Sequence, residues 1–477
     1  MKQIAILGYG REGKAVLKFL KKSSDYKDLH IEVRDKIISK NYLKGLNKFD
    51  TIYRSPGIPY MLLEIQQAKR AGVYPPKFSK GKLRRVKISS ATELFFENCP
   101  CPIIGITGTK GKSTTSTLIY KILYNSGRDV YPPKFFGKKL GRVYLAGNIG
   151  KPAIEILPKL KHNSIVVFEL SSFQLQGLQY SPKIAVVLGL FPDHLDSHKN
   201  FKEYADAKAN ITRWQKKSDV AFYINNNRYA KAIASKSIGK KLSVDHNTPY
   251  SRELENKIRN LIRLPGEHQL KNAIVAAVVT KYLGATDETI YNTIAKFKGL
   301  PHRLQLVRNI KVKPNNISSN VLENMRTNMF INFFNDSAST NPQTTVAAIK
   351  AFTNPIILIA GGKDKNLDFK PLRNALKHSN VKAIVLYGEN KNKIKNVLTN
   401  NLQPTTNNKI PIRLTKKLKD AVNIAYCIAL KLDTVVGCGL SVVGYTILLS
   451  PASASFDQFK NYKERGDYFK KIVKNLK

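Results

Sequence analysis

The residues best suited to chemistry lie in GITGTKGKSTT, at positions 105–115. Its glycines leave backbone N–H groups free to face phosphate oxygens, Lys112 supplies a point charge for the outer phosphates, and Ser113 supplies a hydroxyl for magnesium. The strict phosphate-loop pattern requires glycine where the chain has Ile106. The segment therefore indicates a nucleotide site, and whether a motor, a kinase or a ligase uses it stays open. The candidate nucleotide-binding residues are Gly108, Thr109, Lys110, Gly111, Lys112, Ser113 and Thr114.

Two further segments carry side chains that bind metals. The apolar run SIVVF ends at Glu169, so a carboxylate lies at the carboxyl end of a buried strand. Parallel sheets place magnesium ligands there, although a carboxylate that only caps the strand would give the same pattern. FPDHLDSH places His194 and His198 four residues apart, with Asp193 and Asp196 near them. Zinc is disfavoured against a solvated turn, because no cysteine and no third separated histidine joins them.

The N-terminal segment GYGREG is a second candidate for phosphate binding. Gly8, Gly10 and Gly13 have full G-x-G-x-x-G spacing, and Asp35 ends the next expected strand. Taken alone, this arrangement predicts a dinucleotide enzyme, because the acidic residue would bind a ribose.

The elements that must position these residues alternate between strands and helices. KQIAIL, PIIGIT, SIVVFE, PIILIAGG, VKAIVLYG and TILLSPAS are the expected strands, and helical periodicity lies between them, which predicts an α/β fold with parallel sheets. A chain of 477 residues exceeds what one core supports. NCPCP and GLPHR divide it into three expected domains at 1–98, 99–299 and 300–477.

The composition is that of a protein without a membrane span. The longest nearly apolar run, at 435–449, is too short and too interrupted by glycine to cross a bilayer. MKQIAILGYG lacks the features of a signal peptide, so a cytoplasmic location is expected. The formal charge of +47 is spread along the chain rather than clustered, so we expect no dedicated nucleic-acid partner. The four cysteines form neither a disulfide framework nor a Cys-x-x-Cys pair, and free thiols are expected.

A basic segment occurs twice in the chain. VYPPKFSKGKLRRV at 73–86 and VYPPKFFGKKLGRV at 130–143 agree at ten of fourteen positions. A pair of polyanion-binding hairpins would explain the repeat. Insertion of the same element into two surface loops would also explain it and is the favoured explanation, because lengthening a loop costs little entropy.

Nine segments occur in an order that resembles the bacterial Mur ligases. They are TGTKGKSTT, GNIG, ELSSFQL, PDHLDSH, GEHQLKNA, LPHR, NDSASTNP, GGKDKNLDF and SPASASFDQFKNYKERGDYF. Within that family, SSFQL and the last segment are most similar to the members that add D-glutamate. The resemblance implies a Rossmann-like N-terminal domain, a central P-loop ATPase-like domain with a mostly parallel sheet, and a Rossmann-like C-terminal domain. It also implies a monomer in cytoplasmic peptidoglycan precursor synthesis.

The resemblance implies that ATP phosphorylates the carboxylate of UDP-N-acetylmuramoyl-L-alanine and that the amine of D-glutamate attacks the acyl phosphate. Lys112, Glu169, His194 and Lys208 would be catalytic, with two Mg²⁺ ions held by Ser113, Glu169, His194 and Lys208. Lys208 would be carbamylated.

The remaining implied site residues fall into three groups. Asn272, Arg303 and Asp336 fall on the ATP positions for adenine, phosphate and ribose. The UDP-sugar positions are Gly10, Arg11, Glu12, Asp35, Ser55, Pro56, Gly57 and Asn148, which replaces the dinucleotide interpretation. The glutamate positions are Thr340, Lys365, Ser455 and Phe456.

The chain departs from the family pattern at one charged position. The family has NDSKATN where this chain has NDSASTN, so Ala338 replaces a lysine and the preference for D- or L-glutamate is left open. Residues 311–330 and 435–446 are expected surface insertions. The alternatives are a sibling or folylpolyglutamate-type ligase with another acceptor, a basic nucleic-acid ATPase and an inactive scaffold. The segment DQFKNYKERGDYF disfavours a ligase with another acceptor, and the scattered charge disfavours a nucleic-acid ATPase. An inactive scaffold is disfavoured because the chain keeps all four implied catalytic residues: Lys112, Glu169, His194 and Lys208.

Overall fold

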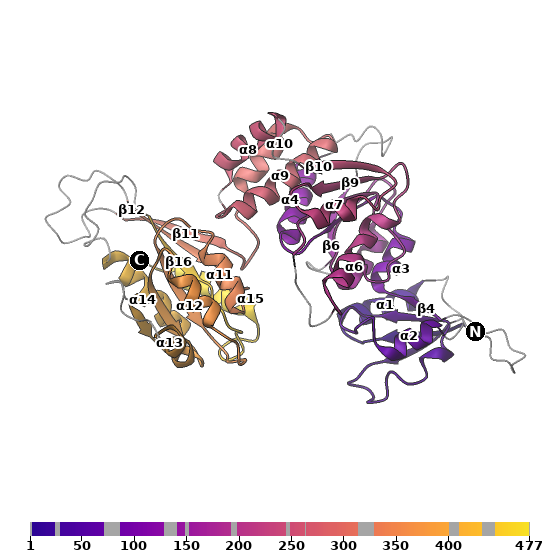
Figure 1. The fold of residues 1–477 in the computed structure, drawn as a ribbon, viewed down its shortest axis with the longest axis horizontal. Coiled ribbons are helices and arrows are strands. Elements are labelled where there is room, and N and C mark those ends of the chain that lie inside the picture. Colours follow the sequence, from indigo (N-terminus) through magenta and orange to yellow (C-terminus); the bar gives the residue numbers. More distant parts are fainter. Residues whose placement is uncertain are drawn as a thin grey trace, which may run out of the picture. The chain divides into compact units, whose positions relative to one another are not determined.

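The structure is a computed structural model, and it describes residues 2–23, 29–70, 86–127, 141–147, 152–191, 198–244, 249–262, 264–312, 329–399, 410–431 and 444–476. It contains three separate sheets (Figure 1). His194, Asn148 and most of both copies of the repeated segment lie outside the described residues, as do most of 311–330 and 435–446.

The first sheet has four parallel strands in the order β2-β1-β3-β4. Helix α1 packs on it through Ala15, Val16 and Leu20, which the helical period brings to one face. Ser90 begins α3 by accepting a hydrogen bond from the Glu93 backbone N–H. The elements are β1 Lys2–Leu7, α1 Arg11–Lys22, β2 Leu29–Arg34, the 3-10 helix η2 Leu46–Lys48, β3 Thr51–Arg54, α2 Leu63–Arg70, β4 Lys87–Ser89 and α3 Ala91–Asn98.

The central sheet has six parallel strands in the order β10-β9-β8-β5-β7-β6. β5 and β7 are buried along their whole length, as expected for strands covered on both faces. The strands are β5 Ile103–Thr107, β6 Val143–Gly147, β7 Ile165–Glu169, β8 Ile184–Val187, β9 Val220–Ile224 and β10 Lys240–Val244. The helices are α4 Lys112–Asn125, the 3-10 helix η4 Ala153–Lys159, α5 Ser172–Leu175, α6 Phe201–Arg213, α7 Arg228–Ala234, α8 Pro249–Leu261, α9 Glu267–Tyr282 and α10 Asp287–Lys296.

The third sheet has the order β11-β12-β16-β13-β14-β15, with β11 antiparallel to β12 and the other pairs parallel. Side chains of β13 alternate between two cores: Ile357 and Ile359 pack in one, Ile356 and Leu358 in the other. The strands are β11 Gln305–Val312, β12 Met329–Asn335, β13 Ile356–Gly361, β14 Val381–Tyr387, β15 Ile412–Leu414 and β16 Gly444–Leu449. The helices are α11 Pro342–Ile349, α12 Lys370–Leu376, α13 Lys391–Thr399, α14 Leu418–Lys431 and α15 Tyr462–Lys474.

The chain forms two compact units. One comprises 1–262 with 271–296, and the other comprises 263–270 with 297–477. The first and central sheets share the first unit, where one apolar core extends through both and the Phe95 ring meets the Phe168 ring edge to face at 5.2 Å. The predicted α/β fold with parallel sheets is confirmed, whereas the division into three domains stays a prediction.

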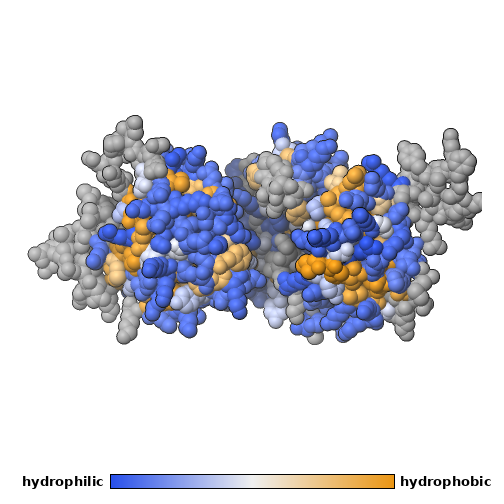
Figure 2. Space-filling view, turned by 90° about the horizontal axis from the view of Figure 1, so that it is seen from below, coloured by the Kyte–Doolittle hydropathy of each residue, from blue (hydrophilic) through white to orange (hydrophobic). Residues whose placement is uncertain are grey.

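The described surface is mainly hydrophilic. Figure 2 shows hydrophilic residues over most of one face, with apolar patches between them. Within the described ranges no helix is long and apolar enough to cross a membrane. The described cysteines, Cys99, Cys101 and Cys427, are free thiols, as predicted.

Candidate active site

The phosphate loop joins the end of β5 to the start of α4. Two of its glycines have positive φ, +151° at Gly108 and +86° at Gly111. A Cβ at Gly108 would lie 2.6 Å from Leu188 Cβ, and one at Gly111 would lie 2.2 Å from Asn272 Oδ1. Both positions therefore require glycine. The same contact brings the predicted adenine-binding residue Asn272 against the loop.

Two lysines converge on one carbonyl of this loop. Lys112 Nζ donates to Gly108 O at 2.9 Å and to Thr109 O at 3.0 Å. Lys208 Nζ donates to the same Gly108 O at 3.0 Å and lies 4.7 Å from the centre of the Tyr204 ring. The Lys208 side chain comes from the middle of α6, and the residue is only 1% exposed. The fold thus brings the buried Lys208 side chain to the loop where phosphates would bind, and its carbamylation stays a prediction.

The Thr109 hydroxyl forms hydrogen bonds within the protein. It lies 3.0 Å from the Tyr204 hydroxyl, is 3.0 Å from Phe191 O and accepts from the Phe191 N–H at 2.9 Å. These bonds hold the loop to α6 and to the residues after β8. The Thr109 backbone N–H also donates to Gly189 O at 3.0 Å, so this residue mainly fixes the position of the loop.

Glu169 ends β7 at the same edge of the sheet. Its register partner on β5 is Ile106, two residues before Gly108, and on β6 it is Gly147. The residue is 2% exposed. Adjacent parallel strands therefore bring this carboxylate to the phosphate loop, as the sequence predicts.

His198 has a structural position that its sequence context did not reveal. Its Nε2 lies 3.0 Å from Ser172 Oγ and its Nδ1 lies 3.3 Å from Glu203 Oε1, and its ring stacks on Phe173. These contacts tie α6 to α5 and bury the imidazole. Asp193, His194 and Asp196 lie outside the described residues, so the structure does not test the zinc interpretation.

The three glycines of the turn after β1, Gly8, Gly10 and Gly13, differ in what surrounds them. Gly8 has φ +91°, and a Cβ at Gly13 would lie 2.1 Å from Gly8 O, so both are required for the turn and for close packing of α1. A Cβ at Gly10 would meet nothing within 4 Å. This leaves open space at the N-terminus of α1, where a phosphate can approach the backbone.

Asp35 and Ser55 hold this turn in place. The Asp35 carboxylate accepts from the Tyr9 N–H at 2.6 Å and from the Ile37 N–H at 2.8 Å. These two bonds lower the pKa of Asp35. Ser55 Oγ donates to Gly8 O at 2.7 Å. Pro56 and Gly57 follow Ser55, and Gly57 is exposed, as is Arg11 at the start of α1.

Glu12 belongs to a buried contact between the first and central sheets. Gln174 Nε2 donates to Glu12 Oε1 at 3.2 Å, and Arg54 donates to Phe173 O at 3.1 Å. Burial raises the pKa of Glu12 and lowers the pKa of Arg54 to about 10. Sequence reasoning did not single out Arg54, whose signal is a charged residue at the end of a buried strand.

In the second unit, Asp336 follows β12 and is almost fully buried. It accepts from Ser339 Oγ at 2.5 Å, from Ser450 Oγ at 2.9 Å and from the Leu304 N–H at 3.2 Å. Burial raises its pKa to about 6. Arg303 is exposed beside it, between His302 and Leu304, which both have positive φ. The chain is therefore in an uncommon conformation where the LPHR segment meets Asp336.

The predicted glutamate residues lie on loops after neighbouring strands β13 and β16 and after β12. Lys365 Nζ lies 4.9 Å from the centre of the Phe456 ring. The Lys363 N–H donates to Ala454 O at 2.9 Å, so the two loops run side by side. Ser455 is buried, whereas Thr340 is half-buried. Ala338 is also half-buried.

Arg465 was missed by sequence reasoning although it lies in the RGDYF segment. It is 0% exposed and donates to Ser337 Oγ, Ser337 O, Ser453 O and Ala454 O at 2.9–3.1 Å. It therefore connects the NDSAS segment to the SPASAS segment. No sequence signal separates this arginine from the many exposed ones.

The fold and the loop define the chain as a nucleotide-binding α/β enzyme of the P-loop kind. Residues 106–280 match the Mur ligase middle domain. The UDP-N-acetylmuramoylalanine--D-glutamate ligase of Acetivibrio thermocellus is 33% identical over 457 residues, which are 92% of this chain and 85% of the relative. The ligase of the same name from Clostridium acetobutylicum is 32% identical over 508 residues, which cover 100% of this chain and 97% of the relative. This chain belongs to the Mur ligase family.

Solved structures agree with the fold. A crystal structure of MurF from Acinetobacter baumannii superposes with a TM-score of 0.52 at 16% identity, covering 84% of each chain. At this identity, the similarity concerns the fold alone.

Proposed function

We propose that this chain joins the amine of D-glutamate to the carboxylate of UDP-N-acetylmuramoyl-L-alanine, converting ATP to ADP and phosphate, as a cytoplasmic monomer in peptidoglycan precursor synthesis. The observation that carries the proposal is the phosphate loop itself, where Lys112 Nζ lies at Gly108 O and Glu169 ends the adjacent strand, because a carboxylate that attacks a polyphosphate needs a cation and metal ligands at that loop. The full-length similarity to relatives named for this reaction supports the choice of substrates.

The reaction has two displacement steps. A carboxylate oxygen of the UDP-sugar attacks the γ-phosphorus of ATP, and the bond from that phosphorus to the ADP oxygen breaks. The glutamate nitrogen then attacks the acyl carbon, phosphate leaves and the nitrogen loses a proton. Both steps bring anions together, so the residues of this chain act mainly by holding and neutralising charge.

The phosphate loop would hold ATP through its backbone and through Lys112. Asn272, against Gly111, would face the adenine. We assign Arg303 and Asp336 of the second unit to the phosphate and ribose of ATP. The raised pKa of Asp336, caused by burial, is compatible with a hydrogen bond to a ribose hydroxyl in either protonation state.

The donor set at the loop fits Mg²⁺, which prefers oxygen ligands. Ser113 lies in the first turn of α4 and Glu169 ends β7, so a hydroxyl and a carboxylate are available. Magnesium supplies neutralisation of phosphate charge. We assign a second magnesium to His194 and Lys208.

Lys208 would serve a metal only as a carbamate, because an ammonium repels a cation. A carbamate keeps one N–H, so the bond to Gly108 O can persist while two oxygens become available. Formation of the carbamate needs the neutral amine, because only a nitrogen with a free lone pair attacks carbon dioxide.

The UDP-sugar would bind at the glycine turn of the first sheet. The open space at Gly10 suits a diphosphate at the N-terminus of α1, and Asp35, Ser55, Pro56 and Gly57 border the turn. Arg11, Glu12 and Asn148 complete the proposed set. Glutamate would bind through Lys365, Thr340, Ser455 and Phe456. The range 1–98 would then supply most of the UDP-sugar contacts, 99–299 most of the ATP contacts, and 300–477 the glutamate contacts.

The test is amide formation by the purified chain, followed by phosphate release and product mass. We expect turnover with ATP, the UDP-sugar and D-glutamate together, and none when one is omitted. Lys112→Ala is the inactive control. L-glutamate, diaminopimelate and L-alanine replace D-glutamate in parallel reactions, and a folate replaces the UDP-sugar in another. Faster turnover with any of these, or with single-stranded DNA alone, would refute the proposal.

A further inference from the structure

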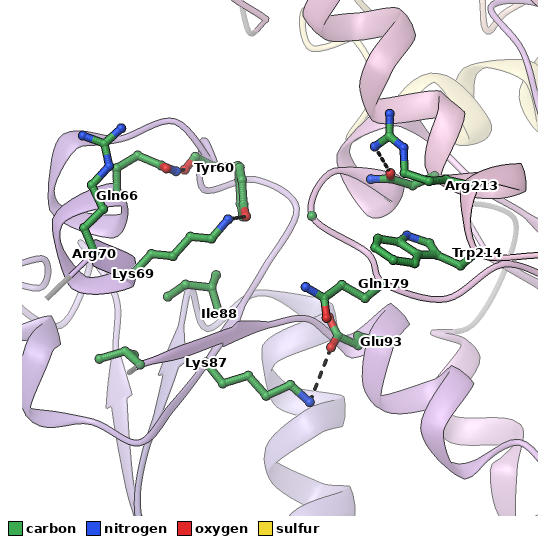
Figure 3. Close-up of a pocket in the computed structure, with 13 residues that line it drawn as sticks. Tyr60, Gln66, Lys69, Arg70, Lys87, Ile88, Glu93, Gln179, Arg213 and Trp214 are labelled. Atoms are coloured by element: carbon green, nitrogen blue, oxygen red, sulfur yellow. Dashed lines mark hydrogen bonds and ion pairs between the residues drawn. The ribbon is translucent and has the colours of Figure 1, made fainter. Parts of the chain in front are cut away.

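A cavity of about 590 Å³ lies between the first and central sheets within the first unit (Figure 3). Tyr60, Lys69 and Arg70 line it from the first sheet's side, and Gln179, Arg213 and Trp214 line it from the central sheet's side. Its size suits a small organic ligand such as a nucleotide.

The cavity does not belong to the site described above. Lys87 is the first residue of β4, and Lys69 and Arg70 form the last turn of α2. The strands of this sheet are parallel, so the cavity borders the edge where strands begin. The glycine turn after β1 lies at the opposite edge, where strands end.

Aromatic rings lie on both sides of the cavity. Tyr60 packs against the central sheet's Gly177, where an added Cβ would lie 2.9 Å from the ring. Trp214 is held by two bonds, from its Nε1 to Leu178 O at 3.0 Å and from its backbone N–H to Ser181 Oγ at 2.9 Å. It remains 46% exposed. A large, positioned and partly exposed indole offers a face to a planar ring.

The charge of the lining is mainly positive. Lys69, Arg70, Lys87 and Arg213 oppose a single acid, Glu93. Lys87 and Arg213 already have ion pairs, with Glu93 and Glu97 and with Asp206 respectively.

Lys69 and Arg70 supply the cations that a ligand can use. Lys69 Nζ donates to the Tyr60 hydroxyl at 3.0 Å. No ion pair joins Lys69 or Arg70 to any carboxylate of the described residues. Both are exposed, so they can turn toward an anion.

Helix α6 connects this cavity to the phosphate loop. Asn210 and Arg213 face the cavity, whereas Lys208, two residues before Asn210, reaches Gly108 O from the other side of the same helix. A ligand in the cavity would therefore contact the helix that carries a proposed catalytic lysine.

We propose that this cavity is a further nucleotide site, separate from the proposed ATP and UDP-sugar sites, in which an aromatic base stacks on Trp214 and the phosphates bind Lys69 and Arg70. The cavity offers a group for each part of the ligand: a partly exposed indole for the base, and two cations without an acidic partner among the described residues for the phosphates. The inference does not depend on the proposed ligase activity.

The chain contains one tryptophan, so intrinsic fluorescence reports directly on this cavity. The experiment titrates ADP into the Lys112→Ala chain, in which binding at the phosphate loop is weakened. We expect a saturable change in Trp214 emission below roughly 5 mM ADP, a range that reveals even millimolar affinity. Raising the salt concentration should weaken it.

A pair of matched double variants tests the cations. Lys69→Gln with Arg70→Gln removes the last-turn cations of α2, and Lys21→Gln with Lys22→Gln removes those of α1. All four side chains are exposed, so folding should be retained. The first variant should bind ADP about tenfold more weakly or worse, and the second should bind normally.

Three results would overturn the proposal. The first is no saturable change in emission. The second is an equal loss of affinity in both double variants, which would mean a general effect of charge. The third is equally tight binding of inorganic pyrophosphate, which would mean that the site recognises an anion without a base.

Discussion

Arg465 offers the sharpest test of how the second unit is held together. Its guanidinium makes four hydrogen bonds to two segments, NDSAS and SPASAS, and it is fully buried. Arg465→Met keeps an unbranched apolar side chain and removes all four donors. Arg465→Lys keeps the charge but loses the planar geometry that reaches both segments.

The expected loss of stability in Arg465→Met follows from the hydrogen-bond acceptors that lose their donor. Three carbonyls and one hydroxyl lose a bond from a charged donor, at about 1 kcal/mol each, so Arg465→Met should lower the free energy of unfolding of this unit by about 4 kcal/mol. Arg465→Lys retains one or two bonds and should cost about 2 kcal/mol. The Michaelis constant for glutamate should rise in Arg465→Lys, because Ala454 O is beside Ser455, whereas that for ATP should change less.

The assay must separate the two units. Trp214 lies in the first unit and reports only on it, so urea-dependent hydrogen exchange of peptides from 297–477 measures the second. Arg413→Met, which removes an exposed arginine of β15 in the same unit, is the control. A loss of less than about 1 kcal/mol in Arg465→Met relative to Arg413→Met would refute the reasoning, since that value is within the range of ordinary substitutions.

Four other predictions concern the proposed reaction and the fold. Lys208→Ala should abolish most turnover but retain ATP binding, with partial rescue by added acetate; near-normal turnover, or a plain amine in carbon-13 spectra of the active enzyme in bicarbonate, would contradict carbamylation. Ala338→Lys should lower the Michaelis constant for glutamate about tenfold, since a charge-assisted bond is worth about 1.5 to 3 kcal/mol; an unchanged constant would mean that the site does not use this charge. Burial raises the pKa of folded Asp336 from its ordinary 3.8 to about 6, so the protonated carboxyl stabilises the fold at low pH. The free energy of unfolding of the second unit should therefore fall by up to about 3 kcal/mol as the pH rises from below 3.8 to above 6, whereas in Asp336→Asn, measured by urea denaturation at the same two pH values, it should fall less. Gly13→Ala should impair folding because its Cβ would lie 2.1 Å from Gly8 O, whereas Gly10→Ala should fold normally and weaken only UDP-sugar binding by calorimetry, with equal stability loss in both arguing against the assigned roles.

Local pattern in the sequence was enough to predict much of the fold. Strands such as PIIGIT and SIVVF were recognised because a strand buried on both faces must be apolar throughout. The phosphate loop and the glycine turn were recognised because positive φ and close backbone approach require glycine at fixed spacing. The position of Glu169 beside the loop followed from the rule that parallel strands end at one edge of a sheet.

Other features were decided only by contacts between segments far apart in the chain. Lys112 and Lys208 share one carbonyl, Arg465 is fully buried, His198 joins two helices, and Trp214 lines a cavity between two sheets. The local motif marks Lys112. For Lys208, Arg465, His198 and Trp214 no local pattern in the sequence predicts the burial or the partners of the side chain. Periodicity and turn chemistry are properties of neighbouring residues, so a sequence encodes them directly. Burial and partnership of a side chain depend on which distant segments the packed core brings together, and only the tertiary structure determines that.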